Sequence, residues 1–251
     1  MRPPVRSSRR NLRNLLASSS VAALLIGGGT PAAFAACSTN FNGVTAPGCT
    51  NSTTITKISI NNSTITSTVI NTGTISPSGI ALTNSSTIQG GIADSGIING
   101  GITLDSTSAV TAAGAVKVTG PTFTGGITNS GTIVGTNNIF SNGSGIFAFG
   151  VSTFGGGITN SAGGTITGGF AGLDIGLVGT FGGGAGGITN AGTIGGGYGV
   201  LVGPVDTFAA GISNTGLITA NNNVAVAISS VGVFGTAVAG GGITNSGTSP
   251  G

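Results

Sequence analysis

One seven-residue motif, Ile-Thr-Asn-Ser-Gly-Thr-Ile, recurs through the second half of the chain and constrains the fold more than any other feature. Successive copies begin 31, 30, 24 and 31 residues apart, and the second copy contains two inserted residues. The copies begin at Ile127, Ile158, Ile188, Ile212 and Ile243, and their asparagines are Asn129, Asn160, Asn190, Asn214 and Asn245. Self-similarity at such a period is typical of a chain that stacks one structural unit on the next.

Shorter versions of the motif occupy the preceding part of the chain, about ten to thirteen residues apart. They are Asn62-Ser63-Thr64-Ile65, Asn71-Thr72-Gly73-Thr74-Ile75, Asn84-Ser85-Ser86-Thr87-Ile88 and Asp94-Ser95-Gly96-Ile97-Ile98. A phenylalanine precedes each later unit in step, at Phe123, Phe154, Phe181, Phe208 and Phe234. The repetition therefore runs through several independent columns of residues.

A third column has the alternating pattern of a short strand, as in Val116-Lys117-Val118. The middle residue of each such strand should point outward, because successive side chains alternate between the faces of a sheet. These positions are Lys117, Phe147, Asp174, Leu201 and Ala227. Two of the few charged residues fall on them, which supports the assignment. Phe147 and Leu201 would be either exposed apolar contacts or residues covered by the longer loops beside them.

The three columns predict an all-β protein in which each unit contributes three short strands, separated by Gly, Asn and Ser turns. Strands this short are not stable alone, but parallel stacking at about 4.8 Å pairs every backbone group with the coils on either side. Stacked asparagine side chains can also hydrogen-bond along the axis. We therefore expect a single-stranded, right-handed parallel β-helix (a β-solenoid) of about seven coils. Disordered chains lack such recurring Ile, Val and Phe, and membrane barrels need longer alternating segments.

The first 35 residues have the features of a cleavable export signal. All five arginines lie within the first 13 residues, an apolar stretch follows, and Ala33-Phe34-Ala35 is an A-x-A cleavage site. We predict a signal peptide at 1–35, a cap segment at 36–50, and a repeat domain at 51–251 that stops inside a repeat. A Gly-rich coil is the alternative for the leader, and twin-arginine (8–13) and lipobox-like (34–37) variants of the signal remain open.

Cys37 and Cys49 are the only cysteines, and both follow the predicted cleavage site. Export into an oxidising compartment favours a disulfide that clips the first turn of the fold. Two free buried thiols are the alternative.

Composition excludes several classes of function. The chain has no His, which removes the commonest general base and metal ligand, and two Cys cannot build a zinc or iron–sulfur site. Beyond residue 13 there are two lysines and four aspartates, a net charge of −2, so no basic surface for nucleic acid is expected. We predict no catalytic residues, no metal and no cofactor.

The Gly-Gly-Ile-Thr-Asn-Ser-Gly-Thr-Ile unit, behind an Arg-rich leader, resembles the passenger domains of bacterial autotransporters, which are secreted by the type V route. The resemblance covers about residues 50–249 and implies a β-helix at the cell surface or outside the cell, reached through the periplasm. It also implies an outer-membrane β-barrel translocator, which in this chain is either lost or supplied by a separate partner.

The resulting hypothesis is an exported, non-enzymatic passenger-type fragment that acts as a surface stalk, adhesin or self-association module. Its partners would be a host or cell-surface glycan or protein, or further copies of the chain. A rival is a β-helical polysaccharide lyase or hydrolase using the four aspartates, of which Asp94 and Asp105 could meet on neighbouring coils, whereas Asp174 and Asp206 should lie on different faces. A second rival is an amyloid-like matrix protein.

Overall fold

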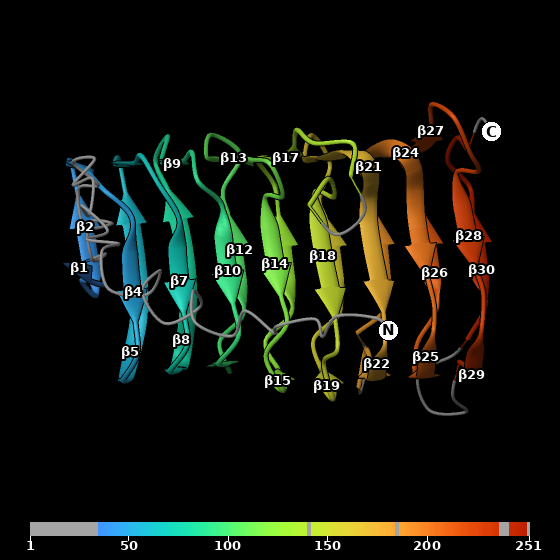
Figure 1. Cartoon of the computed structure of the whole chain (residues 1–251). Helices are drawn as coiled ribbons and strands as arrows, with labels where there is room; N and C mark the ends of the chain where they lie inside the picture. The colour runs from blue at the N-terminus through green and yellow to red at the C-terminus, as the bar shows by residue number, and fades with distance from the viewer. Residues whose placement is uncertain (1–34, 140–141, 184–185, 236–240, 250–251) are drawn as a thin grey trace, which may run out of the picture. The chain divides into compact units, whose positions relative to one another are not determined.

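A computed structural model describes residues 35–139, 142–183, 186–235 and 241–249. Every regular element in these ranges is a β-strand, and the strands form two parallel sheets of 15 strands each, here sheet A and sheet B (Figure 1). The predictions of an all-β fold and of parallel stacking are thus confirmed for the described residues. The predicted signal peptide lies outside them, apart from Ala35. The described residues contain no helix long and apolar enough to span a membrane.

Each sheet consists of two rows of strands, and the chain passes through rows 1, 2, 3 and 4 before it returns to row 1. Rows 1 and 4 form sheet A, and rows 2 and 3 form sheet B. Row 1 contains β1 (Ala35–Ala36), β4 (Cys49–Asn51), β7 (Val69–Asn71), β10 (Ile92–Asp94), β14 (Val116–Val118), β18 (Ile146–Phe149), residues 173–176 of β21 (Thr165–Gly176), residues 200–202 of β24 (Thr193–Val202) and β28 (Val226–Ile228). Row 4 contains β3 (Thr45–Ala46), β6 (Thr64–Ile65), β9 (Thr87–Ile88), β13 (Ala109–Ala112), β17 (Thr132–Gly135), the first parts of β21 and β24, and β27 (Leu217–Ala220).

Sheet B has the same two-row organisation. Row 2 contains residues 54–55 of β5 (Thr54–Asn61), residues 74–75 of β8 (Thr74–Thr83), β11 (Ile97–Ile98), β15 (Thr122–Phe123), β19 (Thr153–Phe154), β22 (Val178–Phe181), β25 (Val205–Phe208) and β29 (Val231–Phe234). Row 3 contains β2 (Asn40–Asn42), the remainders of β5 and β8, β12 (Ile102–Leu104), β16 (Ile127–Asn129), β20 (Ile158–Asn160), β23 (Ile188–Asn190), β26 (Ile212–Asn214) and β30 (Ile243–Asn245).

The seven-residue motif spans two strands and not one. In its first copy, Ile127–Asn129 is β16 in row 3 and Thr132–Gly135 is β17 in row 4, because Ser130-Gly131 turns the chain between them. A coil therefore has four strand positions where three were expected. In the N-terminal part of the stack one coil is 22 residues long, because Ile58 pairs with Ile80 and Ile80 pairs with Ile102. Each short copy of the motif therefore occupies about half a coil.

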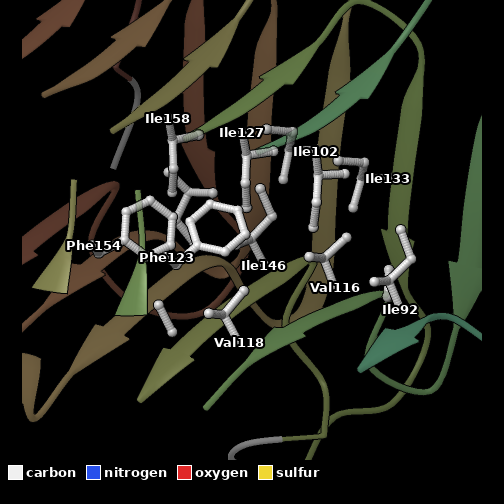
Figure 2. Packing of buried hydrophobic residues seen from close by; sticks show 14 of the residues in the cluster. Ile92, Ile102, Val116, Val118, Phe123, Ile127, Ile133, Ile146, Phe154 and Ile158 are labelled. Atoms are coloured by element: carbon white, nitrogen blue, oxygen red, sulfur yellow. The ribbon is translucent and has the colours of Figure 1, made fainter. Parts of the chain in front are cut away.

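The core lies between the two sheets. Figure 2 shows Ile102, Ile127 and Ile158 of row 3 facing a line made by Ile92, Val116 and Ile146 of row 1. These six side chains are at most 1% exposed. The alternation of side chains along a β-strand explains the pattern. In β16, Ile127 and Asn129 point into the core, and Thr128 between them is exposed.

Glycine is required where row 2 bends into row 3. Gly126 and Gly157 have φ of +71° and +68°, in the left-handed region that glycine enters without steric cost. A Cβ on Gly157 would lie 2.3 Å from the backbone oxygen of Gly187, one coil further along. The glycine pairs of the repeat therefore let adjacent coils approach closely at this bend.

Candidate functional site

The five phenylalanines of the repeat form a continuous stack inside row 2. Their ring centroids are 4.7, 4.9, 4.8 and 5.1 Å apart from Phe123 to Phe234. Phe123, Phe154, Phe181 and Phe208 are fully buried, and Phe234 is partly buried. Isoleucines take the same positions in the preceding coils, as Ile98 pairs with Phe123. The stack serves packing, because four of its five rings are closed off from solvent.

The asparagines of the repeat form a hydrogen-bonded ladder inside row 3. Each side-chain Nδ2 donates to Oδ1 of the asparagine one coil later, at 2.7 to 2.9 Å, and the bonded residues run Asn129, Asn160, Asn190, Asn214, Asn245. The same Nδ2 also donates to backbone carbonyls at the corner, for example from Asn160 to those of Gly164 and Thr193. The ladder therefore satisfies carbonyls that the tight turn directs into the core.

A second ladder lies inside row 1, on the other sheet, and was not predicted. Asn51 Nδ2 donates to Asn71 Oδ1 at 2.8 Å, and Asn71 Nδ2 donates to Asp94 Oδ1 at 2.7 Å. The sequence contained the signal, since Asp94 begins one of the short copies of the motif. The next residue in this row is Val118, so the ladder ends at Asp94.

Asp94 is a buried carboxyl with one satisfied and one unsatisfied oxygen. The side chain is 1% exposed; its Oδ1 accepts from Asn71 and from the Gly96 backbone N–H, and Oδ2 has no partner within the described part of the chain. Burial raises the pKa of Asp94, although the hydrogen bonds to Oδ1 oppose that shift.

The structure keeps the four aspartates apart, as expected for Asp174 and Asp206 but not for Asp94 and Asp105. The interpretation that Asp94 could meet Asp105 is wrong, because Asp94 points into the core while Asp105 lies at the surface, where it accepts from the backbone N–H groups of Asn84 and Thr107. Asp174 belongs to sheet A and the exposed Asp206 to sheet B. Among the described residues there is also no group of three His, Cys, Asp or Glu side chains that could hold a metal ion.

The outward positions of row 1 lie in register, as Lys117 pairs with Phe147, Phe147 with Asp174, and Asp174 with Leu201. Ala227 continues the line. Lys117 Nζ lies 5.7 Å from the centre of the Phe147 ring. Phe147 and Asp174 are only 4% and 3% exposed, and desolvation raises the pKa of Asp174 to about 6.

The two cysteines are joined in a disulfide, Cys37–Cys49, with Cα atoms 4.7 Å apart. The bond links the residue after β1 to the first residue of β4, which is the next strand of row 1. Cys49 is 2% exposed and belongs to the core. The disulfide therefore ties the first described coil to the second.

The surface has a hollow of about 320 Å³ at the bend between row 4 and row 1. Its lining residues are Asn138, Gly169, Phe170, Gly197, Asn221, Asn222 and Asn223. Phe170 and the three consecutive asparagines do not follow the columns of the repeat. This departure from the repeat is the one sequence signal that could have identified them as residues of a site. A second hollow, on sheet B around Gly211, adjoins residues outside the described ranges.

Comparison of the chain with protein-family models, with curated proteins and with solved structures finds no significant match. Function is therefore inferred from the geometry of the described residues.

Proposed function

We propose that the chain is an exported, non-enzymatic surface protein whose repeats wind as a right-handed, single-stranded β-helix. In this proposal it is a passenger-type fragment that acts as a stalk, adhesin or self-association module. A translocator of the outer membrane, in the same chain or separate, would carry it from the periplasm to the cell surface.

The observation that carries the proposal is the unbroken register of the rows. Row 3 continues from β2 to β30, with inward positions filled by apolar side chains and the asparagine ladder. In the described residues the inward positions of row 3 are thus occupied by packing and by hydrogen bonds within the stack, which supports a role for the outward side chains. In row 3 these are mostly Thr and Ser, for example Thr128, Thr159 and Thr189 in consecutive coils.

Localisation in the organism that encodes the chain tests this proposal. We expect the exported protein to begin at Ala36 by N-terminal sequencing, and intact cells to expose it to added protease. A matched variant, Ala33→Asp/Ala35→Asp, places charged residues at the cleavage site and should accumulate uncut. An uncut wild-type chain that stays in the cytoplasm would refute the proposal.

Incubation with a panel of polysaccharides tests the non-enzymatic part. We expect no cleavage by the wild type. Cleavage that disappears when Asp94, Asp105, Asp174 and Asp206 are all replaced by Asn would instead support the lyase or hydrolase alternative.

A further inference from the structure

The residues that line the hollow at the bend between rows 4 and 1 depart from the columns of the repeat. The hollow spans four consecutive coils, which contribute Asn138, Gly169-Phe170, Gly197 and Asn221–Asn223 in turn. In the two middle coils the chain crosses the bend as the continuous strands β21 and β24. In the two flanking coils it leaves the sheet after β17 and β27, and these loops supply the asparagines.

Glycine keeps the middle of the hollow open. A Cβ on Gly169 would lie 2.1 Å from Asn138 Oδ1, and one on Gly197 would lie 2.6 Å from the Phe170 backbone oxygen. Any larger residue at either position would therefore fill the space or displace its lining.

An aromatic pair lies on this bend outside the core. Phe170 lines the hollow, and the ring of Tyr198, one coil later, packs against it with centroids 5.7 Å apart and planes at 60°. Both residues are partly exposed, unlike the fully buried rings Phe123 to Phe208. A partly exposed aromatic side chain offers an apolar surface of fixed geometry to a ligand.

The polar lining consists of amides alone. Asn138, Asn221, Asn222 and Asn223 are exposed, and their side chains form no hydrogen bond with any other described residue. Each amide offers donors and an acceptor in one group. This contrasts with the asparagines of the two internal ladders, whose amides are bonded to one another.

Charge selects among ligand classes. None of the seven lining residues is charged, and the chain beyond residue 13 carries only Lys57 and Lys117 as cations. Phosphate and sulfate groups are recognised by Arg and Lys, so nucleic acids and anionic glycans do not suit this site. A ligand with many neutral hydroxyl groups and an apolar ring face matches both the amides and the aromatic ring.

We propose that this hollow is a binding site for neutral saccharides. Its volume of about 320 Å³ is at the small end of the range for ligand pockets, which suits a short saccharide or the end of a longer chain. Phe170 would lie against the apolar face of a sugar ring, and the asparagines would hydrogen-bond its hydroxyl groups. This inference rests on the proposed adhesin function, for which it names the class of ligand.

Binding of the purified full-length chain to an array of neutral oligosaccharides, with sialylated and sulfated counterparts beside them, tests the site. We expect binding to a subset of the neutral probes, followed by calorimetric titration with the best one. Phe170→Ala should weaken that binding about tenfold, and Asn222→Ala about threefold or more, through lost ring contact and lost hydrogen bonds. Asn222 lies in an exposed loop, so its variant keeps the test valid even where Phe170→Ala lowers stability.

Two control variants have the same chemistry elsewhere on the surface. Phe149→Ala removes a partly exposed ring of sheet A that does not line the hollow, and Asn40→Ala removes an exposed amide of β2. Both should bind like the wild type. The proposal is overturned by absence of binding to all neutral probes, by preference for the anionic ones, or by equal losses in site and control variants. Failure here leaves surface localisation untouched, so the two proposals are tested separately.

Discussion

Asp94 and Asn71 occupy the same position of row 1 in adjacent coils and differ in one group. Asp94 has a second oxygen, Oδ2, where Asn71 has the amino group Nδ2. The Nδ2 of Asn71 donates to the carbonyls of Gly73 and Ile97 as well as to Asp94. An ionised Asp94 has nothing to donate to the corresponding carbonyls of its own corner, and its Oδ2 is unsatisfied. The last position of the row 1 ladder therefore carries a buried, partly unsatisfied group, which costs stability when charged.

We predict that Asp94→Asn makes the protein more stable at pH 7, by about 1–3 kcal/mol, the size of relieving one buried unsatisfied polar group. The pKa of Asp94 is raised by burial in the folded state, so its protonated form is favoured there. Its contribution to stability is therefore complete below the unfolded pKa and is lost as pH rises through the folded one. Denaturant unfolding at several pH values between 3 and 8 measures this.

The difference in unfolding free energy between wild type and Asp94→Asn measures the contribution of Asp94 alone. The pKa of Asp174 is also raised, to about 6, but Asp174 is present in both proteins and changes their stability in the same sense. The exposed Asp206→Asn is the matched control and should leave the free energy of unfolding at pH 7 close to that of the wild type. Equal pH dependence in wild type and Asp94→Asn would contradict the assignment.

At the scale of the strand, the repeat encodes which side chains enter the core and which corner needs an asparagine. Where a corner is tight, as in Asn129-Ser130-Gly131, the asparagine donates to the carbonyl of the turn glycine. Corner length alone does not decide the residue, because Leu104 precedes the four-residue corner 105–108 whereas Asn160 precedes the equally long corner 161–164 and donates to the carbonyl of Gly164. The internal polar ladder therefore lies in row 1 of sheet A up to Asp94, and in row 3 of sheet B from Asn129 onward.

Adjacent residues of β23 provide a test of strand orientation. Ile188 is 1% exposed and Thr189 is exposed. Ile188→Asp places an unpaired carboxylate among apolar side chains and should cost several kcal/mol or prevent folding. Thr189→Asp should cost under about 1 kcal/mol, the range of strand preferences at a solvated position. Thermal melting distinguishes them, and equal losses would mean that β23 is not oriented as described.

The ladder itself is tested by Asn160→Ala. The substitution removes an acceptor for Asn129 and the donor to Asn190, Gly164 and Thr193. We expect a loss of about 3 kcal/mol or more in unfolding free energy, since several buried groups lose their partner.

A surface ladder of the same chemistry supplies the control. Asn61 Nδ2 donates to Asn42, and Asn84 donates to Asn61, at an exposed corner. Asn61→Ala should cost less than about 1 kcal/mol, because water replaces the lost bonds. A similar loss in both variants would show that burial does not determine the strength of the ladder.

The sequence predicted the parallel all-β stack because identical motifs in register leave few other arrangements. It misjudged the strand count, since Ser-Gly inside the motif reads equally well as a loop or as a sharp corner. It missed the Asn51–Asn71–Asp94 ladder because the short copies of the motif alternate between two corners, so that Asn71 and Asp94 belong to row 1 whereas the other copies follow row 3. The hollow at Phe170 depends on four coils having different lengths at one bend, which periodicity cannot reveal.

At the scale of the whole stack, every strand pairs only with strands of the adjoining coils. In such a linear arrangement, stability is close to a sum of coil stabilities and nearest-neighbour terms, and local changes have local effects. The Cys37–Cys49 disulfide belongs to this scale, because it joins the first described coil to the second.

We therefore predict that Cys37→Ala/Cys49→Ala frays the N-terminal coil without abolishing the rest of the fold. A loop with a sequence separation of 12 is worth roughly 3 kcal/mol in the chain-entropy model, and the strands β1, β2 and β3 of the first described coil each pair on one side only. Hydrogen exchange should show lost amide protection in β1 to β4 and near-native protection from β9 onward. The single replacement Val44→Ala, at an exposed residue of the same coil, should leave both regions unchanged. Equal loss of protection along all rows would mean that the stack unfolds as one cooperative unit, and that the disulfide stabilises the whole of it.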